Sequence, residues 1–145
     1  MRILIVDDEI EIRKVLKLLL ENAGHEIVEA GDGERAVIAV REDRSIDLCI
    51  MDIMMPVMNG IEATKKIREF STLPVLFLTA RSMESDKEQA YSGGGDDYLI
   101  KPFSSRELLM KVEALTRRYN SYSAKENTGD AIRLWGGVVL MPDTR

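Results

Sequence analysis

Short apolar runs alternate with longer amphipathic stretches along this chain, and that alternation limits its possible folds more than any other feature. Compact apolar runs predict buried strands, and apolar residues three or four positions apart predict helices. Strands that alternate with helices form an α/β fold with a mostly parallel sheet. The predicted strands cover residues 3–6, 25–30, 48–51, 74–78 and 98–100, and the predicted helices cover residues 9–23, 33–44, 59–68, 84–92 and 104–119.

Two of these elements differ from the others. The strand predicted at 25–30 carries Glu26 and Glu29, and charged positions of this kind suit the edge of a sheet. The helix predicted at 84–92 has few apolar residues to bury. Because tertiary packing supplies most of a helix's stability, we expect this helix to be a candidate for movement.

Carboxylates directly follow two of the predicted strands. Asp7 and Asp8 come after residues 3–6, and Asp52 comes after residues 48–51. Ligands of open parallel sheets bind beyond the carboxyl ends of the strands, so neighbouring strands would bring these three side chains into one pocket. Two charges about 4 Å apart repel by about 4 kcal/mol at an effective dielectric constant of about 20. Such a cluster either raises a carboxyl pKa or holds a hard cation.

Composition narrows the class of protein. The net charge of -5 gives no sign of non-specific binding to nucleic acid. Cys49 is the only cysteine and lies in an apolar run, so we predict a small buried hydrophobe and no disulfide framework. No apolar stretch approaches the roughly 18 residues of a membrane helix, and a strand predicted from Ile3 leaves no room for a signal peptide. We therefore expect a cytoplasmic protein with no membrane partner.

The pattern changes after the predicted helix at 104–119. Residues 120–130 are rich in Asn, Ser, Lys, Thr and Gly and show no periodicity, which predicts a linker. Residues 131–145 hold two short apolar runs around Gly136-Gly137. An isolated hairpin is marginal in water, so this segment is expected to be the beginning of a further domain.

Four motifs, correctly ordered and spaced, carry a family resemblance. They are V-D-D-E at 6–9, M-D-I-M-M-P-V-M-N-G at 51–60, F-L-T-A at 77–80 and D-D-Y-L-I-K-P-F at 96–103. On these motifs residues 1–119 resemble the receiver domain of two-component response regulators. The resemblance implies a flavodoxin-like (βα)5 doubly wound parallel sheet with strand order 2-1-3-4-5. It also implies a signalling domain that assists its own phosphorylation and dephosphorylation rather than a conventional enzyme.

The resemblance implies that Asp52 accepts a phosphoryl group from a sensor histidine kinase. A carboxylate nucleophile of this kind forms an acyl phosphate. The implied cofactor is Mg²⁺, held by Asp7, Asp8 and Asp52 and by the backbone carbonyl of Met54. Because Mg²⁺ keeps several of its water ligands, these few protein ligands suffice.

Lys101 and Thr79 complete the implied site, the first as a point charge on phosphoryl oxygens and the second as a hydroxyl donor. Thr79 and Tyr98 would form the switch, since movement of Thr79 toward the phosphoryl group leaves space that Tyr98 can fill. The family resemblance also predicts a cis peptide between Lys101 and Pro102, for which proline lowers the energetic difference.

Taken singly, each site residue has a simpler interpretation. Asp7 and Asp8 could cap the helix at 9–23, and Asp8 could both cap that helix and serve the metal. Thr79 alone could be a strand-end hydroxyl, and Lys101 a solvated charge. Their common position, at the carboxyl ends of four of the five predicted strands, favours a shared site.

The output surface implied by the resemblance consists of the fourth helix, the fifth strand and the fifth helix. In the OmpR/PhoB-type subfamily this face forms a two-fold dimer held by ion pairs. Lys87 and Glu107 match one such pair, and Asp97 and Lys111 match another, although lysine lacks the planar fork of the more usual arginine. The predicted dimer face comprises Lys87, Asp96, Asp97, Glu107, Lys111 and Arg118.

Residues 131–145 resemble the opening strands of a winged-helix DNA-binding domain. This resemblance implies a truncated transcription regulator that reaches DNA through a domain mostly absent here. The alternative is a stand-alone receiver whose phosphorylated face binds a partner protein. An aspartyl-phosphate phosphatase would need a second carboxylate where Met54 stands, and a flavin protein would need a phosphate-binding loop where Asp7-Asp8-Glu9 stands.

Overall fold

The computed structural model describes residues 1–80 and 95–128, with side chains placed at 1–79 and 95–118. Within the described residues, the chain divides after Lys111 into two compact parts. The helix predicted at 84–92, which includes Lys87, and the segment 131–145 lie outside the described residues.

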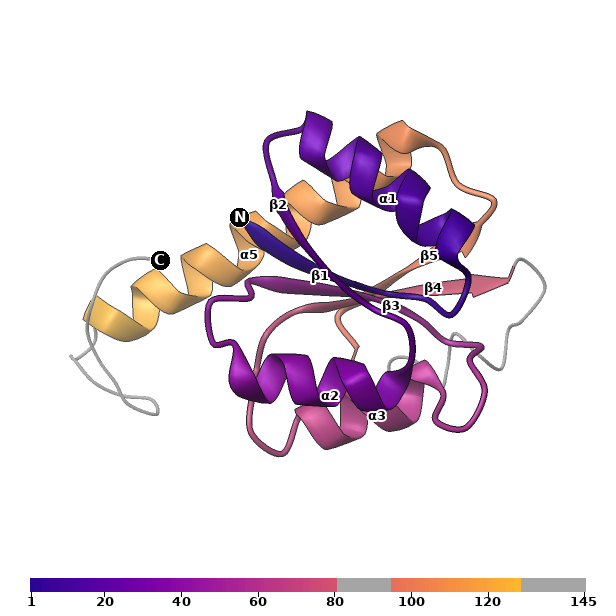
Figure 1. The fold of residues 1–145 in the computed structure, drawn as a ribbon. Coiled ribbons are helices and arrows are strands. Elements are labelled where there is room, and N and C mark those ends of the chain that lie inside the picture. The colour runs from indigo at the N-terminus through magenta and orange to yellow at the C-terminus, as the bar shows by residue number, and fades with distance from the viewer. Residues whose placement is uncertain (81–94, 129–145) are drawn as a thin grey trace. The chain divides into compact units, whose positions relative to one another are not determined.

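A parallel sheet with strand order β2-β1-β3-β4-β5 forms the centre of the first part, as Figure 1 shows. This order confirms the predicted flavodoxin-like topology and the edge position of the second strand. The elements are β1 (Arg2–Val6), α1 (Ile10–Asn22), β2 (Glu26–Ala30), α2 (Gly33–Glu42), β3 (Leu48–Asp52), α3 (Gly60–Ile67), β4 (Val75–Ala80), β5 (Asp97–Lys101) and α5 (Ser105–Thr128).

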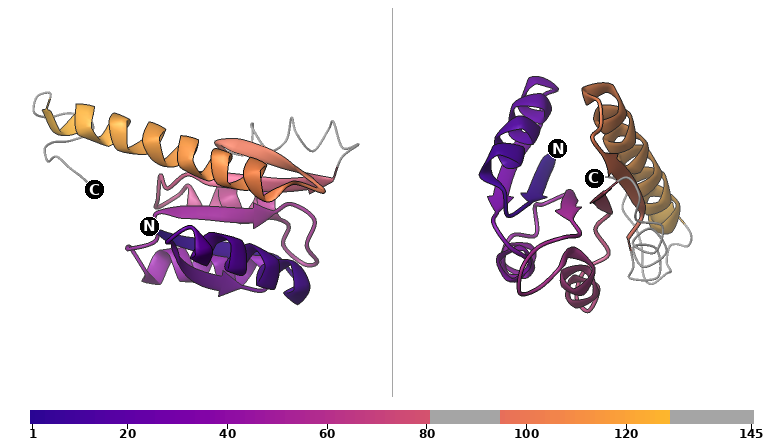
Figure 2. Two further views of the ribbon diagram at one scale, coloured as in Figure 1. Left: turned by 90° about the horizontal axis from the view of Figure 1, so that it is seen from above. Right: turned by 90° about the vertical axis from the view of Figure 1, so that its right-hand side faces the viewer.

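Helices cover both faces of the sheet, with α1 on one face and α2 and α3 on the other (Figure 2). Every residue of β3 is buried, as expected for a central strand covered on both faces. Alternate residues of the central strands pack against α2 and α3, in a cluster that includes Leu4, Cys49 and Phe77. The burial of Cys49 confirms its predicted place in the core.

Local sequence signals explain where several helices begin and end. Asn59 and Glu62 form a capping box at the start of α3, and Ser104 and Glu107 exchange the same pair of hydrogen bonds before α5, as their spacing predicts. Gly24 follows α1 with a φ of 95°, a conformation that favours glycine.

The predicted end of the last helix, near residue 119, is wrong. Helix α5 continues to Thr128 and therefore includes most of the segment predicted as a linker. The apolar periodicity stops at Leu115, but the polar residues that follow include neither Gly nor Pro before Gly129. Residues of these types do not break a helix, so a boundary predicted from the apolar periodicity alone fell too early. Among the described residues, no helix combines the length and apolarity needed to cross a bilayer.

Candidate functional site

Strand order and register place four polar residues at one rim of the sheet. Strand β1 pairs with β3 through Val6 and Met51, so Asp7, which follows β1, lies beside Asp52, the last residue of β3. Strand β4 pairs with β5 through Thr79 and Ile100, which brings Thr79 to the same rim as the end of β5. The rim is therefore the carboxyl edge at which ligands of such sheets bind.

Three carboxylates meet at this rim. Asp7, Asp8 and Asp52 each offer one oxygen, and these oxygens lie within 4.8 Å of one another. Asp7 and Asp52 are buried, whereas Asp8 is exposed. The structure thus brings together the three carboxylates that the sequence predicts, with two of them shielded from water.

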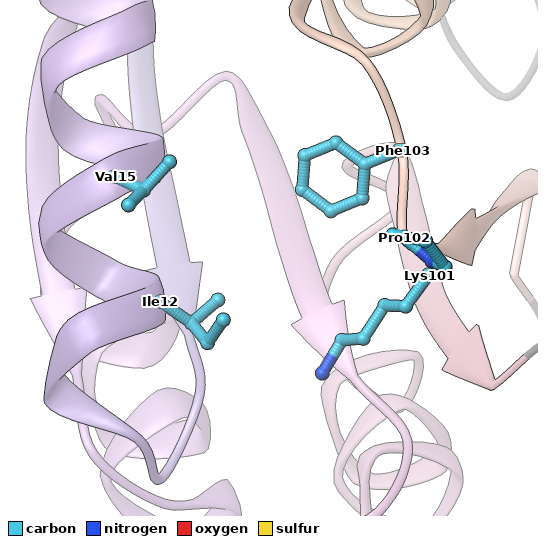
Figure 3. Close-up of a pocket in the computed structure, with 5 residues that line it drawn as sticks. All are labelled: Ile12, Val15, Lys101, Pro102 and Phe103. Carbon is cyan, nitrogen blue, oxygen red and sulfur yellow. The ribbon is translucent and has the colours of Figure 1, made fainter.

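Lys101 is the cation that faces this cluster. Its Nζ lies 3.4 Å from Oδ1 of Asp52 and 3.6 Å from Oδ2 of Asp7. The extended side chain leaves β5 just before Pro102, as Figure 3 shows, and the peptide between the two residues is cis, as predicted. One ammonium group thus faces two buried carboxylates, so the cluster keeps an excess of negative charge.

Burial, more than the excess negative charge, raises the pKa of both buried carboxyl groups. Burial, followed by the charge of Asp7, raises the pKa of Asp52 from 3.8 to about 6, although Lys101 and a hydrogen bond from the Met54 backbone oppose the rise. Burial also raises the pKa of Asp7, against a hydrogen bond from the Glu9 backbone and the charge of Lys101. The ionised cluster is therefore unfavourable by itself, which is the condition under which a divalent cation binds well.

Two buried oxygens at the rim have no hydrogen-bond partner, as donor or acceptor, in the parts of the chain that the structure describes. They are Oδ2 of Asp7 and Oγ1 of Thr79. Buried polar atoms almost always have partners, so each such atom requires an explanation. A hard cation would satisfy the carboxylate oxygen, and an anionic ligand with acceptor oxygens would satisfy the hydroxyl. The donor set thus fits Mg²⁺ together with a phosphoryl group.

The turn between β1 and α1 differs from the expected cap. Glu9 is the N-cap of α1 and its side chain makes no capping hydrogen bond, so the suggested capping role of Asp8 is wrong. Instead, Oδ1 of Asp7 accepts a hydrogen bond of 2.9 Å from the Glu9 backbone. Arg13 of α1 donates to the Asp7 carbonyl oxygen at 2.6 Å, a contact that the sequence motifs do not predict.

The loop after β3 closes tightly around the end of that strand. The Gly60 backbone donates to the Ile53 carbonyl at 3.0 Å, and a Cβ at Gly60 would collide with the carbonyl oxygen of Asp52. Met54, whose carbonyl the sequence predicts as a metal ligand, approaches the Asp52 carboxylate through its backbone N–H. The methionine side chain is largely exposed.

Val57 in this loop has a φ of 68°, and its side chain is fully exposed. The left-handed region costs an L-residue roughly 1–2 kcal/mol, and β-branched residues enter it least readily. We expect Val57→Asn to raise the free energy of unfolding by about 1 kcal/mol, because asparagine tolerates this conformation and no packing is lost. Urea denaturation measures the change. Val57→Thr, which keeps the β-branch, should give no gain, and equal stability of all three proteins would contradict the assignment of strain.

The predicted switch and dimer residues occupy several different environments. Tyr98 is partly buried against the core, and Nζ of Lys111 lies 5.7 Å from its ring centroid. Lys111 also pairs with Asp97 at 3.1 Å within the same chain. Asp96 accepts hydrogen bonds from the Val75 backbone and from Arg68. Of the other predicted face residues, Glu107 caps α5, Arg118 is exposed, and Lys87 lies outside the described residues.

An apolar groove lies beside the charged rim. Ile12 and Val15 of α1 form one wall, and the stem of Lys101 with Pro102 and Phe103 forms the other, as Figure 3 shows. Its volume is about 390 Å³. The groove leaves apolar side chains exposed next to the carboxylate cluster, where a partner that approaches Asp52 would meet them.

Comparison with known proteins identifies a family to which the chain is similar. Residues 3–113 match the family model of the response regulator receiver domain. The uncharacterized transcriptional regulatory protein YrkP of Bacillus subtilis is 45% identical over 135 residues, which cover 93% of this chain and 58% of YrkP. ResD of Bacillus subtilis, a transcriptional regulatory protein, is 43% identical over 122 residues, which cover 84% of this chain and 50% of ResD. The chain thus spans about half the length of these relatives.

Solved structures show the same fold. A two-component response regulator from Clostridium difficile superimposes with a TM-score of 0.78 at 34% identity and covers 83% of this chain and 98% of its own. The chemotaxis protein CheY4 of Vibrio cholerae gives a TM-score of 0.72, also at 34% identity, over 79% of this chain and 97% of its own.

Proposed function

The chain belongs to the response regulator receiver domain family of two-component signalling proteins, and from this premise we propose that it accepts a phosphoryl group on Asp52 from a sensor histidine kinase. One observation carries the proposal above the others: the buried Asp52 carboxylate faces Lys101 at 3.4 Å inside a cluster of three carboxylates. A nucleophile, a cation and a set of hard oxygen ligands thus meet at one strand end.

The reaction needs little covalent chemistry from the protein. An oxygen of the ionised Asp52 attacks phosphorus while the bond from phosphorus to the donor atom breaks, and the leaving group takes its proton from solvent. Lys101 attracts the phosphoryl oxygens in a position it already holds beside Asp52. The Thr79 hydroxyl, buried at the same rim, donates to another phosphoryl oxygen. Catalysis consists of positioning and charge stabilisation.

Asp7, Asp8 and Asp52 would hold Mg²⁺, with the backbone carbonyl of Met54 as a further ligand. The support is the carboxylate oxygens within 4.8 Å of one another and the unsatisfied Oδ2 of Asp7. When bound, the ion supplies positive charge that offsets the carboxylates and the incoming phosphoryl group. The chain's own contribution is to hold the ligating oxygens in place before the donor arrives.

The signal would leave through the output surface that the resemblance implies, which comprises the helix predicted at 84–92, β5 and α5, as in OmpR/PhoB-type regulators. Thr79 and Tyr98 form the proposed switch, and phosphorylation would favour a homodimer. Ion pairs between Lys87 and Glu107 and between Asp97 and Lys111, together with Asp96 and Arg118, would hold that dimer. The Asp97–Lys111 pair already exists within one chain, so dimer formation requires an exchange of partners.

Transcriptional control would follow from a DNA-binding domain of which residues 131–145 form the start. Two relatives support this proposal, since both are named transcriptional regulatory proteins and this chain spans about half of each. In the same proposal, residues 1–119 form the receiver and residues 120–130 connect it to the output domain.

Intact mass after incubation with acetyl phosphate tests the proposal. We expect the wild-type protein to gain one phosphoryl group in the presence of Mg²⁺ and none when the metal is chelated, because the carboxylate cluster repels the anionic donor. Asp52→Asn should gain none under either condition. Gain of the group by Asp52→Asn, or no gain by a folded wild-type protein, would contradict Asp52 as the acceptor.

A further inference from the structure

Arg13 of α1 contacts both the residue that follows β1 and a residue of β2. Its Nη1 donates to the carbonyl oxygen of Asp7 at 2.6 Å, and its Nε donates to Oε1 of Glu29 on β2 at 3.1 Å. The Arg13 side chain is only 17% exposed. A single guanidinium therefore ties α1 to the end of β1 on one side and to the edge strand on the other.

The contact from Arg13 is one of several hydrogen bonds that hold the backbone and side chain of Asp7 in position. Its backbone N–H donates to the Ala30 carbonyl at 3.3 Å, and its Oδ1 accepts from the Glu9 backbone at 2.9 Å. With the carbonyl held by Arg13, Asp7 keeps one side-chain oxygen without a hydrogen bond, and that oxygen is Oδ2, 3.6 Å from Lys101. The hydrogen bonds thus leave the oxygen that points into the cluster as the one available to a ligand.

We propose that Arg13 is a positioning residue for the cation site, acting through the Asp7 backbone to aim the free carboxylate oxygen. The inference rests on the proposed function, because it concerns the site that would hold Mg²⁺. Groups that orient metal ligands contribute to affinity, and their loss typically weakens metal binding about 10- to 100-fold. The planar fork of arginine suits this role because two of its nitrogens donate in fixed directions to different acceptors.

The charge of Arg13 and its positioning of Asp7 would have opposite effects on the affinity for Mg²⁺. Arg13 is a cation close to a site for another cation, so its charge alone repels Mg²⁺ and its removal would tighten binding. If Arg13 instead aims Asp7, removal weakens binding. Lysine at position 13 retains the charge but lacks the fork, so a positioning role predicts weaker binding for both Arg13→Ala and Arg13→Lys.

The test is a titration of the unphosphorylated full chain with MgCl2 at constant ionic strength, followed by backbone amide NMR shifts of residues 7–9. We expect the dissociation constant for Mg²⁺ to rise about 10-fold in Arg13→Ala and nearly as much in Arg13→Lys. Lys17→Ala is the matched control, because Lys17 also pairs with Glu29, at 3.6 Å, but makes no hydrogen bond to Asp7 in the part of the chain that the structure describes. It should bind Mg²⁺ as tightly as the wild-type protein or slightly more tightly.

A second readout separates positioning from general damage. In the acetyl phosphate reaction, the Mg²⁺ concentration for half-maximal rate should rise about 10-fold in Arg13→Lys, while the rate at saturating Mg²⁺ stays near that of the wild-type protein. A folded Arg13→Lys protein that binds Mg²⁺ as well as the wild-type protein would overturn the inference and leave the proposed function intact. A wild-type protein that binds no Mg²⁺ would overturn both.

Discussion

Replacing Lys101 with alanine is expected to slow phosphorylation of Asp52 by acetyl phosphate about 100- to 1,000-fold. Loss of a single preorganised charge or donor at a reacting centre typically has an effect of this size. Lys101 already lies 3.4 Å from the nucleophilic carboxylate, so it needs no rearrangement to reach phosphoryl oxygens. Its removal also leaves two buried carboxylates without the cation that faces them, which increases repulsion of an anionic donor.

The rate should be measured by intact mass over time at saturating Mg²⁺ and well above pH 6, so that Asp52 is ionised in the wild-type protein. Lys65→Ala is the control, because Lys65 is an exposed lysine in the last turn of α3. Lys101→Arg, which keeps the charge with a different shape, should fall between wild type and Lys101→Ala. A rate for Lys101→Ala within a few-fold of wild type would show that Lys101 does not stabilise the reacting group.

The carboxylate cluster and Lys101 could be located from sequence because each follows an apolar run. In a parallel sheet the end of such a run identifies a position at one rim, so Asp7, Asp52 and Lys101 are placed by strand alternation alone. The family resemblance of the motifs then implied the strand order, and the charges of Glu26 and Glu29 predicted the edge position of β2. What the sequence could not supply were interactions that depend on distances between elements far apart along the chain.

Arg13 illustrates this limit. Its two acceptors, the Asp7 carbonyl and Glu29, are separated by 22 positions, and they meet only because β2 lies beside β1. The left-handed Val57 depends in the same way on how the loop closes over Gly60, which local propensity does not describe. The end of α5 was predicted too early for a different reason, because the sequence after Leu115 shows no apolar periodicity from which a helix can be predicted.

Metal-free Asp52→Asn is expected to be more stable than the wild-type protein near pH 7 by about 3 kcal/mol. The folded-state pKa of Asp52, raised from 3.8 to about 6, corresponds to a penalty of this order for the ionised form. Asparagine preserves the size of the side chain and removes the charge that Asp7 repels. The site therefore stores instability that a bound cation would relieve, as is common where function conflicts with packing.

The free energy of unfolding should depend on pH through the titration of Asp52. Because the folded protein binds the Asp52 proton more tightly than the unfolded chain, the unfolding free energy of the wild-type protein should rise as the pH falls from above 6 toward 4. Asp52→Asn lacks this group, so its advantage should shrink over the same range. Urea denaturation in a metal chelator measures both, with Glu42→Gln as the control because Glu42 is an exposed carboxylate at the end of α2.

Addition of Mg²⁺ should relieve the instability of the ionised carboxylate cluster. If the ionised cluster is the source of the instability, Mg²⁺ should stabilise the wild-type protein more than Asp52→Asn, because the variant has lost one of the three ligating carboxylates. The stability gap near pH 7 should then narrow as Mg²⁺ is added. A gap that is absent without metal, or one that widens with Mg²⁺, would mean that the buried Asp52 carboxylate is not the strained element of this site.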